Sequence, residues 1–275
     1  PTSKPLRAWI AAGGADQIVV DAPGRWNEPT RRAGAMVRGD GASVARALAE
    51  RVDTRDGSWS DAWVDAEERA QQAIDEVLGG NPAISEPSVH RALGGCFADG
   101  ESVLLASSMP IRDAESFMRG GEAAVRLFSN RGANGIDGLV STAAGVELGS
   151  SGPTWAILGD LAVQHDLGGV AALAALGTPL RLVVIDNGGG GIFDFLPQAG
   201  QIEPERFERL FTTPGALDFE RLADLFGIPY LAVESPEDLP RIADQDRVLA
   251  HVRVARADNV DLHGRIAQAV AVAVG

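Results

Sequence analysis

Asp160 and Asn187 are the residues whose types and spacing most directly suggest chemistry in this chain of 275 residues. Asp160 follows Gly159 at the end of one apolar stretch, and Asn187 ends a second apolar stretch and precedes four glycines, 188–191. A carboxylate at the start of a helix repels a phosphate group unless a cation lies between them. The pair therefore indicates Mg²⁺ bridging a diphosphate, with oxygen ligands from Asp160, Asn187 and one backbone carbonyl among 188–191.

The elements around these residues should bring them to the same place. Residues 155–158 and 180–185 are typical of buried strands, and the apolar positions between them predict one helix that stops at Gly177. A right-handed βαβ unit makes its strands parallel, so Asp160 and Asn187 should face the same crevice. The alternative is structural, with Asp160 as a helix cap and Asn187 in a turn. Two such features at the ends of neighbouring strands favour the metal site.

The rest of the chain predicts the α/β class. Strands and helices alternate with short links over 86–275, which indicates a doubly wound parallel sheet of about six strands. Residues 1–52 contain two strands and two helices, and we expect them to be the C-terminal part of another α/β domain. Residues 53–85 hold an amphipathic helix that should connect the two. Because the chain begins with Pro1 and not with Met, we expect a processed product or a piece of a longer protein.

Composition restricts the class of partner. The net charge of −14 argues against a nucleic-acid surface or an anionic membrane as partner. No uncharged apolar run approaches the ~20 residues of a membrane span. The single cysteine, Cys96, excludes an internal disulfide and fits a reducing cytoplasm, which is the location that we expect. The cluster Arg25, Arg31 and Arg32 could bind an anion, although a solvated loop is the simpler interpretation.

Three segments resemble one enzyme family. Residues 129–146 (SNRGANGIDGLVSTAAGV), 159–169 (GDLAVQHDLGG) and 187–198 (NGGGGIFDFLPQ) are similar to the 2-succinyl-5-enolpyruvyl-6-hydroxy-3-cyclohexene-1-carboxylate synthases of menaquinone biosynthesis, which depend on thiamin diphosphate. Gly159-Asp160 followed by Asn187 resembles the metal motif of the whole thiamin-diphosphate superfamily. The flanking segments are more specific and resemble this one family within it. Another thiamin-dependent 2-oxoacid decarboxylase or synthase, and a non-catalytic anion-binding module, are the alternatives.

The resemblance implies a reaction and a set of residues. Such enzymes decarboxylate 2-oxoglutarate and add the succinyl carbanion to isochorismate in a 1,4-addition. It implies thiamin diphosphate with Mg²⁺ (or Mn²⁺) as cofactors, and Asp160, Asn187 and the Gly189 carbonyl as metal ligands. The residues that it places at the cofactor are Ser108, Ile136, Gly159, Asp160, Leu161, Ala162, Asn187, Gly189 and Phe193.

Arg112, Arg131 and Ile136 are the expected catalytic residues. The resemblance implies that both arginines hold substrate carboxylates, which suits the planar guanidinium group, and that Ile136 presses under the bent cofactor. Surface ion pairs for the arginines and a core contact for Ile136 are the structural alternatives. Asp186 stands where many relatives carry asparagine, and we expect its carboxylate to point away from the metal.

The resemblance also implies that part of the enzyme lies elsewhere. Relatives use a glutamate on an N-terminal pyrimidine-binding domain, and nothing in residues 1–86 resembles that domain. We therefore expect the chain alone to be inactive and to require that domain. The superfamily builds its sites between subunits, so a homodimer or homotetramer is expected.

Overall fold

The computed structural model describes residues 3–26, 28–53 and 56–275, which form two compact units, Pro1–Ala66 and Glu67–Gly275. The division falls within the long helix α3 (Ser58–Gly79). The domain boundaries expected from the sequence, at 52 and 85, stay a prediction.

The first unit contains a small parallel sheet. Its elements are α1 (Lys4–Ala12), β1 (Gln17–Val20), β2 (Ala33–Val37) and α2 (Gly41–Ala49), and β1 pairs with β2. Ser3 and Asp40 cap the two helices by accepting hydrogen bonds from backbone N–H groups in the first turns. Neither helix contains a buried residue. The two strands and two helices predicted for 1–52 are confirmed.

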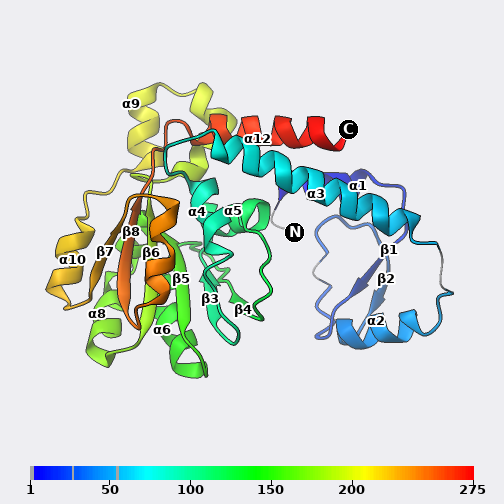
Figure 1. Ribbon diagram of the computed structural model, residues 1–275, viewed down its shortest axis with the longest axis horizontal. Coiled ribbons are helices and arrows are strands. Elements are labelled where there is room, and N and C mark those ends of the chain that lie inside the picture. The colour runs from blue at the N-terminus through cyan, green and yellow to red at the C-terminus, as the bar shows by residue number, and fades with distance from the viewer. Residues whose placement is uncertain (1–2, 27, 54–55) are drawn as a thin grey trace. The chain divides into compact units, whose positions relative to one another are not determined.

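The second unit is built on a parallel sheet with the strand order β4-β3-β5-β6-β8-β7 (Figure 1). All of its strand pairs are parallel, as the alternation of strands and helices predicts. The strands are β3 (Ser102–Leu105), β4 (Arg126–Phe128), β5 (Thr154–Gly159), β6 (Leu180–Asp186), β7 (Tyr230–Val233) and β8 (Val248–Arg253).

Helices cover both faces of this sheet (Figure 1). On one face pack α6 (Leu139–Gly149), α7 (Asp160–His165), α8 (Leu167–Leu176) and α10 (Phe219–Leu225). On the other face pack α4 (Glu86–Leu93), α5 (Met109–Phe117) and α11 (Pro240–Ala243). The helix α12 (Asn259–Val274) packs with Ile74 of α3 and Phe117 of α5 in a third cluster, and α9 (Pro204–Phe207) is a single turn. The doubly wound fold predicted from the sequence is confirmed.

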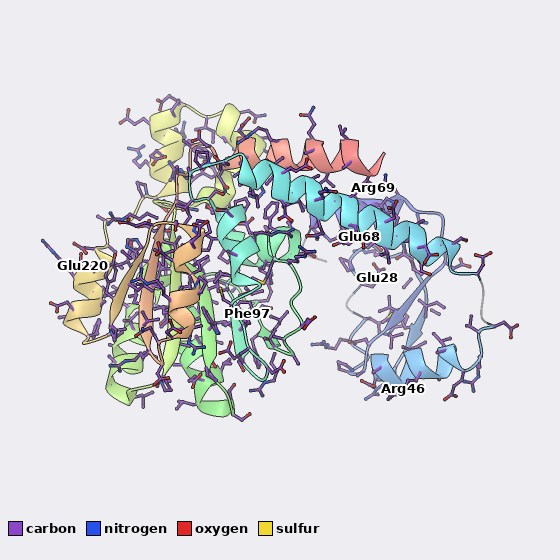
Figure 2. All side chains as sticks on the ribbon, in the orientation of Figure 1. Glu28, Arg46, Glu68, Arg69, Phe97 and Glu220 are labelled. Carbon is purple, nitrogen blue, oxygen red and sulfur yellow. The ribbon has the colours of Figure 1, made fainter. Side chains whose placement is uncertain are left out.

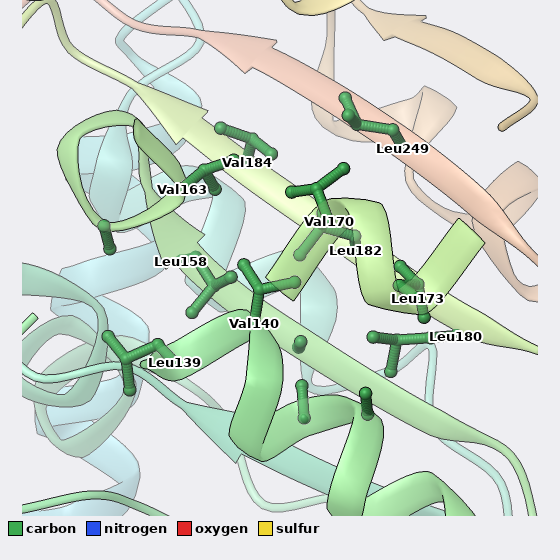
Figure 3. Packing of buried hydrophobic residues seen from close by; sticks show 14 of the residues in the cluster. Leu139, Val140, Leu158, Val163, Val170, Leu173, Leu180, Leu182, Val184 and Leu249 are labelled. Atoms are coloured by element: carbon green, nitrogen blue, oxygen red, sulfur yellow. The ribbon is translucent and has the colours of Figure 1, made fainter. Parts of the chain in front are cut away.

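Apolar side chains fill the two layers between the sheet and its helices. Figure 3 shows the layer in which Leu158, Leu182 and Val184 of the strands meet Val140 of α6 and Val170 of α8. On the opposite face Phe97, labelled in Figure 2, packs edge-on against Trp155 with ring centroids 5.3 Å apart. The exposed side of α10 carries Glu220, labelled in Figure 2, with Arg221, Asp224 and Leu225.

The helix predicted between β5 and β6 is two helices, because Asp166 interrupts it. The Asp166 carboxylate accepts hydrogen bonds from the N–H groups of Gly169 (3.1 Å) and Ser141 (2.7 Å). A backbone with φ −121° and ψ 45° at Asp166 separates α7 from α8. The single-helix prediction was wrong because periodicity does not reveal a side chain that caps a new helix within an apolar stretch. Over the described ranges, no helix is both long enough and apolar enough to cross a membrane.

Candidate cofactor site

A cavity of about 390 Å³ lies at the carboxyl ends of β3, β4, β5 and β6. The chain leaves β3 for its neighbour β4 on one side and then returns past β3 to β5 on the other. Ligands of open α/β sheets bind where the strand order reverses in this way. The cavity therefore lies where the topology alone would place a site.

Every residue that the sequence analysis expected to be catalytic, to bind the cofactor or to bind the metal lines this cavity. They are Ser108, Arg112, Arg131, Ile136, Gly159, Asp160, Leu161, Ala162, Asn187, Gly189 and Phe193. The register of β5 and β6 aligns Gly159 with Ile185, so the residues that follow both strands emerge at the same edge. The predicted shared crevice is confirmed, and the individual roles stay predictions.

Asp160 begins α7 and is 6% exposed. Burial, and after it the nearby charge of Asp186, raise the pKa of Asp160 to about 7 against the opposing effect of backbone hydrogen bonds that include Leu161 and Gly189. A buried carboxylate with this pKa lacks sufficient compensation for its negative charge. A cation beside it would supply that compensation.

Asn187 presents an unpaired amide oxygen. Its Nδ2 donates to Oε1 of Glu86 at 2.7 Å, whereas its Oδ1 is buried and has no hydrogen-bond partner among the described residues. Buried polar atoms are nearly always paired, so an unpaired Oδ1 in a cavity is a ready ligand for a cation.

Asp186 does not line the cavity, and its carboxylate contacts β8 and the first glycine after Asn187. Its expected orientation away from the metal stays a prediction. Its Oδ2 lies 2.8 Å from Nε2 of His251 on β8, and its Oδ1 accepts from the N–H of Gly188 at 3.0 Å. Burial alone would raise the pKa of Asp186, but these hydrogen bonds and the charges of His251 and Arg253 lower it below its ordinary value.

The glycines after Asn187 are required by close contacts. Gly189 has φ +140°, and a Cβ there would lie 2.5 Å from the carbonyl oxygen of Thr212. The N–H of Gly190 donates to that same oxygen at 2.7 Å. The loop is thereby fixed against the segment 208–212, with its backbone along the cavity.

These groups fit a magnesium ion. Among the described residues no three His, Cys, Asp or Glu side chains gather as metal ligands, so a metal would need amide or carbonyl oxygens as well. The cavity offers the Asp160 carboxylate, the unpaired amide oxygen of Asn187 and the backbone of Gly189, while the Glu86 carboxylate in its lining accepts from Nδ2 of Asn187. Mg²⁺ takes few protein oxygens and completes its octahedron with phosphate and water.

Ser108 has a strained backbone at the edge of this site. Its φ of +78° and ψ of −134° are rarely adopted by residues other than glycine. Such strain costs roughly 1–3 kcal/mol and is found at functional sites. Arg112, one turn further along α5, donates from Nη1 to the carbonyl oxygen of Ser108. The strand-to-helix turn after β3 is thus held by the side chain predicted to bind substrate.

Arg131, Ile136 and Phe193 complete the predicted set in different environments. Arg131 is exposed at the cavity, and Ile136 is half-buried and packs on the core between the sheet and α6. Ile136 thus makes the core contact given as its structural alternative and also lines the cavity, and its role under the cofactor stays a prediction. Phe193 is 36% exposed and packs edge-on against Phe211.

Glu86 and Asp113 were missed by sequence reasoning. Glu86 lines the cavity and is 2% exposed, and Asp113 on α5 is fully buried. Burial raises the pKa of Glu86, and it raises the pKa of Asp113 well above its ordinary value, with a further contribution from Glu86. Asp113 contacts Glu86, and Nε2 of His263 lies 3.4 Å from its Oδ1. Because Glu86 is 101 positions from Asn187, no local pattern could have revealed their contact.

Comparison with known proteins adds independent information on the family. Residues 123–254 match the family described as thiamine pyrophosphate enzyme, C-terminal TPP binding domain. A 2-succinyl-5-enolpyruvyl-6-hydroxy-3-cyclohexene-1-carboxylate synthase of Bacillus velezensis is 34% identical over 98% of the chain, and one of Myxococcus xanthus is 34% identical over all of it. One of Halobacterium salinarum is 39% identical over 86% of the chain. The chain spans 47%, 47% and 40% of these relatives, respectively.

Proposed function

Since residues 123–254 belong to the family of C-terminal TPP-binding domains of thiamine pyrophosphate enzymes, we propose that the cavity holds the diphosphate end of thiamin diphosphate through Mg²⁺. The observation that carries this proposal is that one cavity is lined both by Asn187, whose Oδ1 is unpaired, and by Asp160, whose carboxylate is poorly compensated. Bound thiamin diphosphate would supply the thiazolium carbon at which a 2-oxo acid is decarboxylated.

Different groups of this chain would hold the metal and face the diphosphate. Asp160, Asn187 and the Gly189 carbonyl hold the metal, with Mn²⁺ as a possible replacement. Gly159, Leu161 and Ala162 line the cavity next to the metal and face the diphosphate. A side chain at position 189 would meet the Thr212 carbonyl and displace the loop that offers the Gly189 carbonyl.

The remaining lining residues bind substrate and shape the site. The proposed substrates are 2-oxoglutarate and isochorismate, both of which carry carboxylates, and the proposed activity is that of the curated relatives. Arg131 and Arg112 bind those carboxylates, while Ile136, Ser108 and Phe193 pack beside the cofactor. The activity further needs an N-terminal pyrimidine-binding domain and a homo-oligomer, and the chain by itself would not turn over 2-oxoglutarate.

The first test uses the longest natural polypeptide that carries this sequence, called the full polypeptide below. Titration calorimetry measures thiamin diphosphate binding with and without Mg²⁺. Asp160→Ala should abolish the binding that depends on Mg²⁺, because it removes the charged ligand. Binding that ignores Mg²⁺ in the unaltered protein would contradict the metal site and favour an anion-binding module.

The second test addresses the substrate. Arg131→Ala should lower kcat/KM for 2-oxoglutarate by ~2–4 kcal/mol of transition-state free energy while cofactor affinity stays unchanged. Arg221→Ala, on the exposed side of α10 outside the cavity, is the matched control. A fall in cofactor affinity instead would show that Arg131 belongs to the cofactor site.

A further inference from the structure

The side-chain amide of Asn187 has two ends of similar shape, and only one of them can bind a cation. Oδ1 is a ligand for a metal ion, whereas the Nδ2 group would present N–H protons to it. In the structure Nδ2 is directed at Glu86 and Oδ1 is left without a partner. A carboxylate oxygen accepts and cannot pair with Oδ1, so the contact with Glu86 selects the orientation of the amide.

Glu86 is held in place for this contact. It is the first residue of α4, and Ser85 caps that helix by accepting from the N–H of Ser88 while the Ser88 hydroxyl accepts from the N–H of Ser85. The Glu86 side chain is 2% exposed and lies next to Asp113, which is fully buried on α5. A carboxylate enclosed in this way cannot rotate into solvent.

Space beside the amide depends on a glycine. A Cβ at Gly191 would lie 2.6 Å from Nδ2 of Asn187, which is closer than atoms can approach. The loop of glycines therefore also makes room for the end of the amide that faces Glu86.

We propose that Glu86 is a positioning residue that fixes the Asn187 amide by accepting its Nδ2 hydrogen bond, so that Oδ1 faces the metal. The inference rests on the proposed magnesium–thiamin diphosphate site and adds the residue that prepares one of its ligands. Partners of metal ligands typically contribute about 10–100-fold to metal affinity.

Four variants of the full polypeptide separate this role from a general effect on folding. Glu86→Leu removes the acceptor, whereas Glu86→Gln keeps an oxygen that can accept from Nδ2. Asn187→Asp puts a second carboxylate against Glu86, and the double variant E86Q/N187D relieves that repulsion by offering an amide donor. Glu101→Gln is the matched control, because Glu101 is a buried carboxylate at the amino end of β3, outside the cavity lining.

The measurement is Mn²⁺ affinity, followed from the electron paramagnetic resonance signal of free Mn²⁺ at a saturating concentration of thiamin diphosphate. E86L should bind Mn²⁺ about 10–100-fold more weakly than the unaltered protein, and E86Q within about threefold of it. N187D should bind weakly, and E86Q/N187D should recover at least about tenfold relative to N187D. E101Q should match the unaltered protein. The unfolding temperature of each variant shows which of them fold. If E86L does not fold, the affinities of E86Q, N187D and E86Q/N187D test the positioning role.

Three results would overturn the positioning role: unchanged affinity in E86L, a loss in E86Q as large as that in E86L, or no recovery in the double variant. Equal losses in E86Q and E86L would mean that the charge of Glu86 acts on the metal directly. A lack of Mn²⁺ binding in the unaltered protein would instead refute the proposed function, so the two failures are distinguishable.

Discussion

His90 should make the second unit less stable as the pH falls, and replacing it should remove that effect. The side chain is fully buried on α4, its Nδ1 lies 2.9 Å from the carbonyl oxygen of Glu86, and its Nε2 has no hydrogen-bond partner among the described residues. Burial, with a smaller contribution from His263, lowers the pKa of His90 from 6.5 to about 4, although the hydrogen bond with the Glu86 carbonyl opposes the shift. The imidazole is therefore neutral in the folded chain at pH 5.5 and largely protonated in the unfolded chain.

The sign and the size of the effect follow from this difference. The folded state binds fewer protons than the unfolded state between pH 4 and 6.5, so the free energy of unfolding decreases as the pH falls through that window. A shift of this size corresponds to about 3 kcal/mol once the window is crossed, of which about 1 kcal/mol falls between pH 7.5 and 5.5. Measurements should stop at pH 5.5, because the sequence pI is about 4.7 and the protein would have little net charge near that pH.

Urea unfolding followed by tryptophan fluorescence provides the assay. Trp155 in β5 is fully buried, so its emission reports on the sheet of the second unit. The difference in unfolding free energy between the unaltered chain and His90→Gln should change by about 1 kcal/mol from pH 7.5 to 5.5. His165→Gln alters an exposed histidine and is the matched control. The remaining tryptophans are more than half exposed: Trp9, Trp26, Trp59 and Trp63.

Taking the difference between variants is essential. Carboxyl groups whose pKa is raised in the fold, such as Asp194, work in the opposite sense, because their contribution to stability is lost as the pH rises. The two effects partly cancel in the unaltered chain. A difference between the unaltered chain and His90→Gln that stays constant from pH 7.5 to 5.5 would refute the assignment of His90 as a histidine held neutral by burial.

Three further predictions concern stability and can be checked by the same urea unfolding. Gly189→Ala should destabilise the chain by more than about 1 kcal/mol, because its Cβ would meet the Thr212 carbonyl at 2.5 Å, and a neutral result would contradict the close approach. Glu101→Leu should cost ~3–5 kcal/mol, because it leaves the buried Arg181 guanidinium without its carboxylate, and a loss under about 1 kcal/mol would contradict that. Ser108→Gly should stabilise the chain by about 1 kcal/mol through relief of its positive φ, and destabilisation would show that the hydroxyl matters more than the strain.

The sequence was sufficient to predict the fold and the edge of the sheet at which the site lies. Apolar stretches of strand length and helix-ending glycines such as Gly177 are local signals, and they give the six parallel strands and the position of Asp160 and Asn187. Side-chain contacts over long distances in sequence were not predictable. The contact between Glu86 and Asn187 and the packing of Thr212 against Gly189 depend on how helices and loops pack on the finished sheet.

The break between helices at Asp166 and the strained backbone of Ser108 were not predicted from the sequence, for a more local reason. Both are single residues whose backbone departs from the pattern of their neighbours, Asp166 because its carboxylate caps a new helix and Ser108 because it turns sharply from β3 into α5. Hydrophobic periodicity is averaged over many residues and therefore does not reveal a departure at one residue. Serine at a position that suits glycine indicates a constraint that outweighs backbone strain.

Two carboxylates lie at the ends of β5 and β6, and their partners in the sheet give them different roles: Asp186 is structural, and Asp160 is available to bind a cation. Asp186 has His251 from β8 and the N–H of Gly188 as partners, so its charge is compensated within the protein. Asp160 is more deeply buried, and its backbone hydrogen bonds do not prevent burial and Asp186 from raising its pKa. Had both carboxylates been uncompensated, the edge would repel a diphosphate and its metal would have to offset two charges. Asp186 is paired with His251, and Glu86 accepts from Nδ2 of Asn187. The Asp160 carboxylate and the Asn187 amide oxygen therefore remain for the cation, and these ligands suit a magnesium ion shared with a diphosphate.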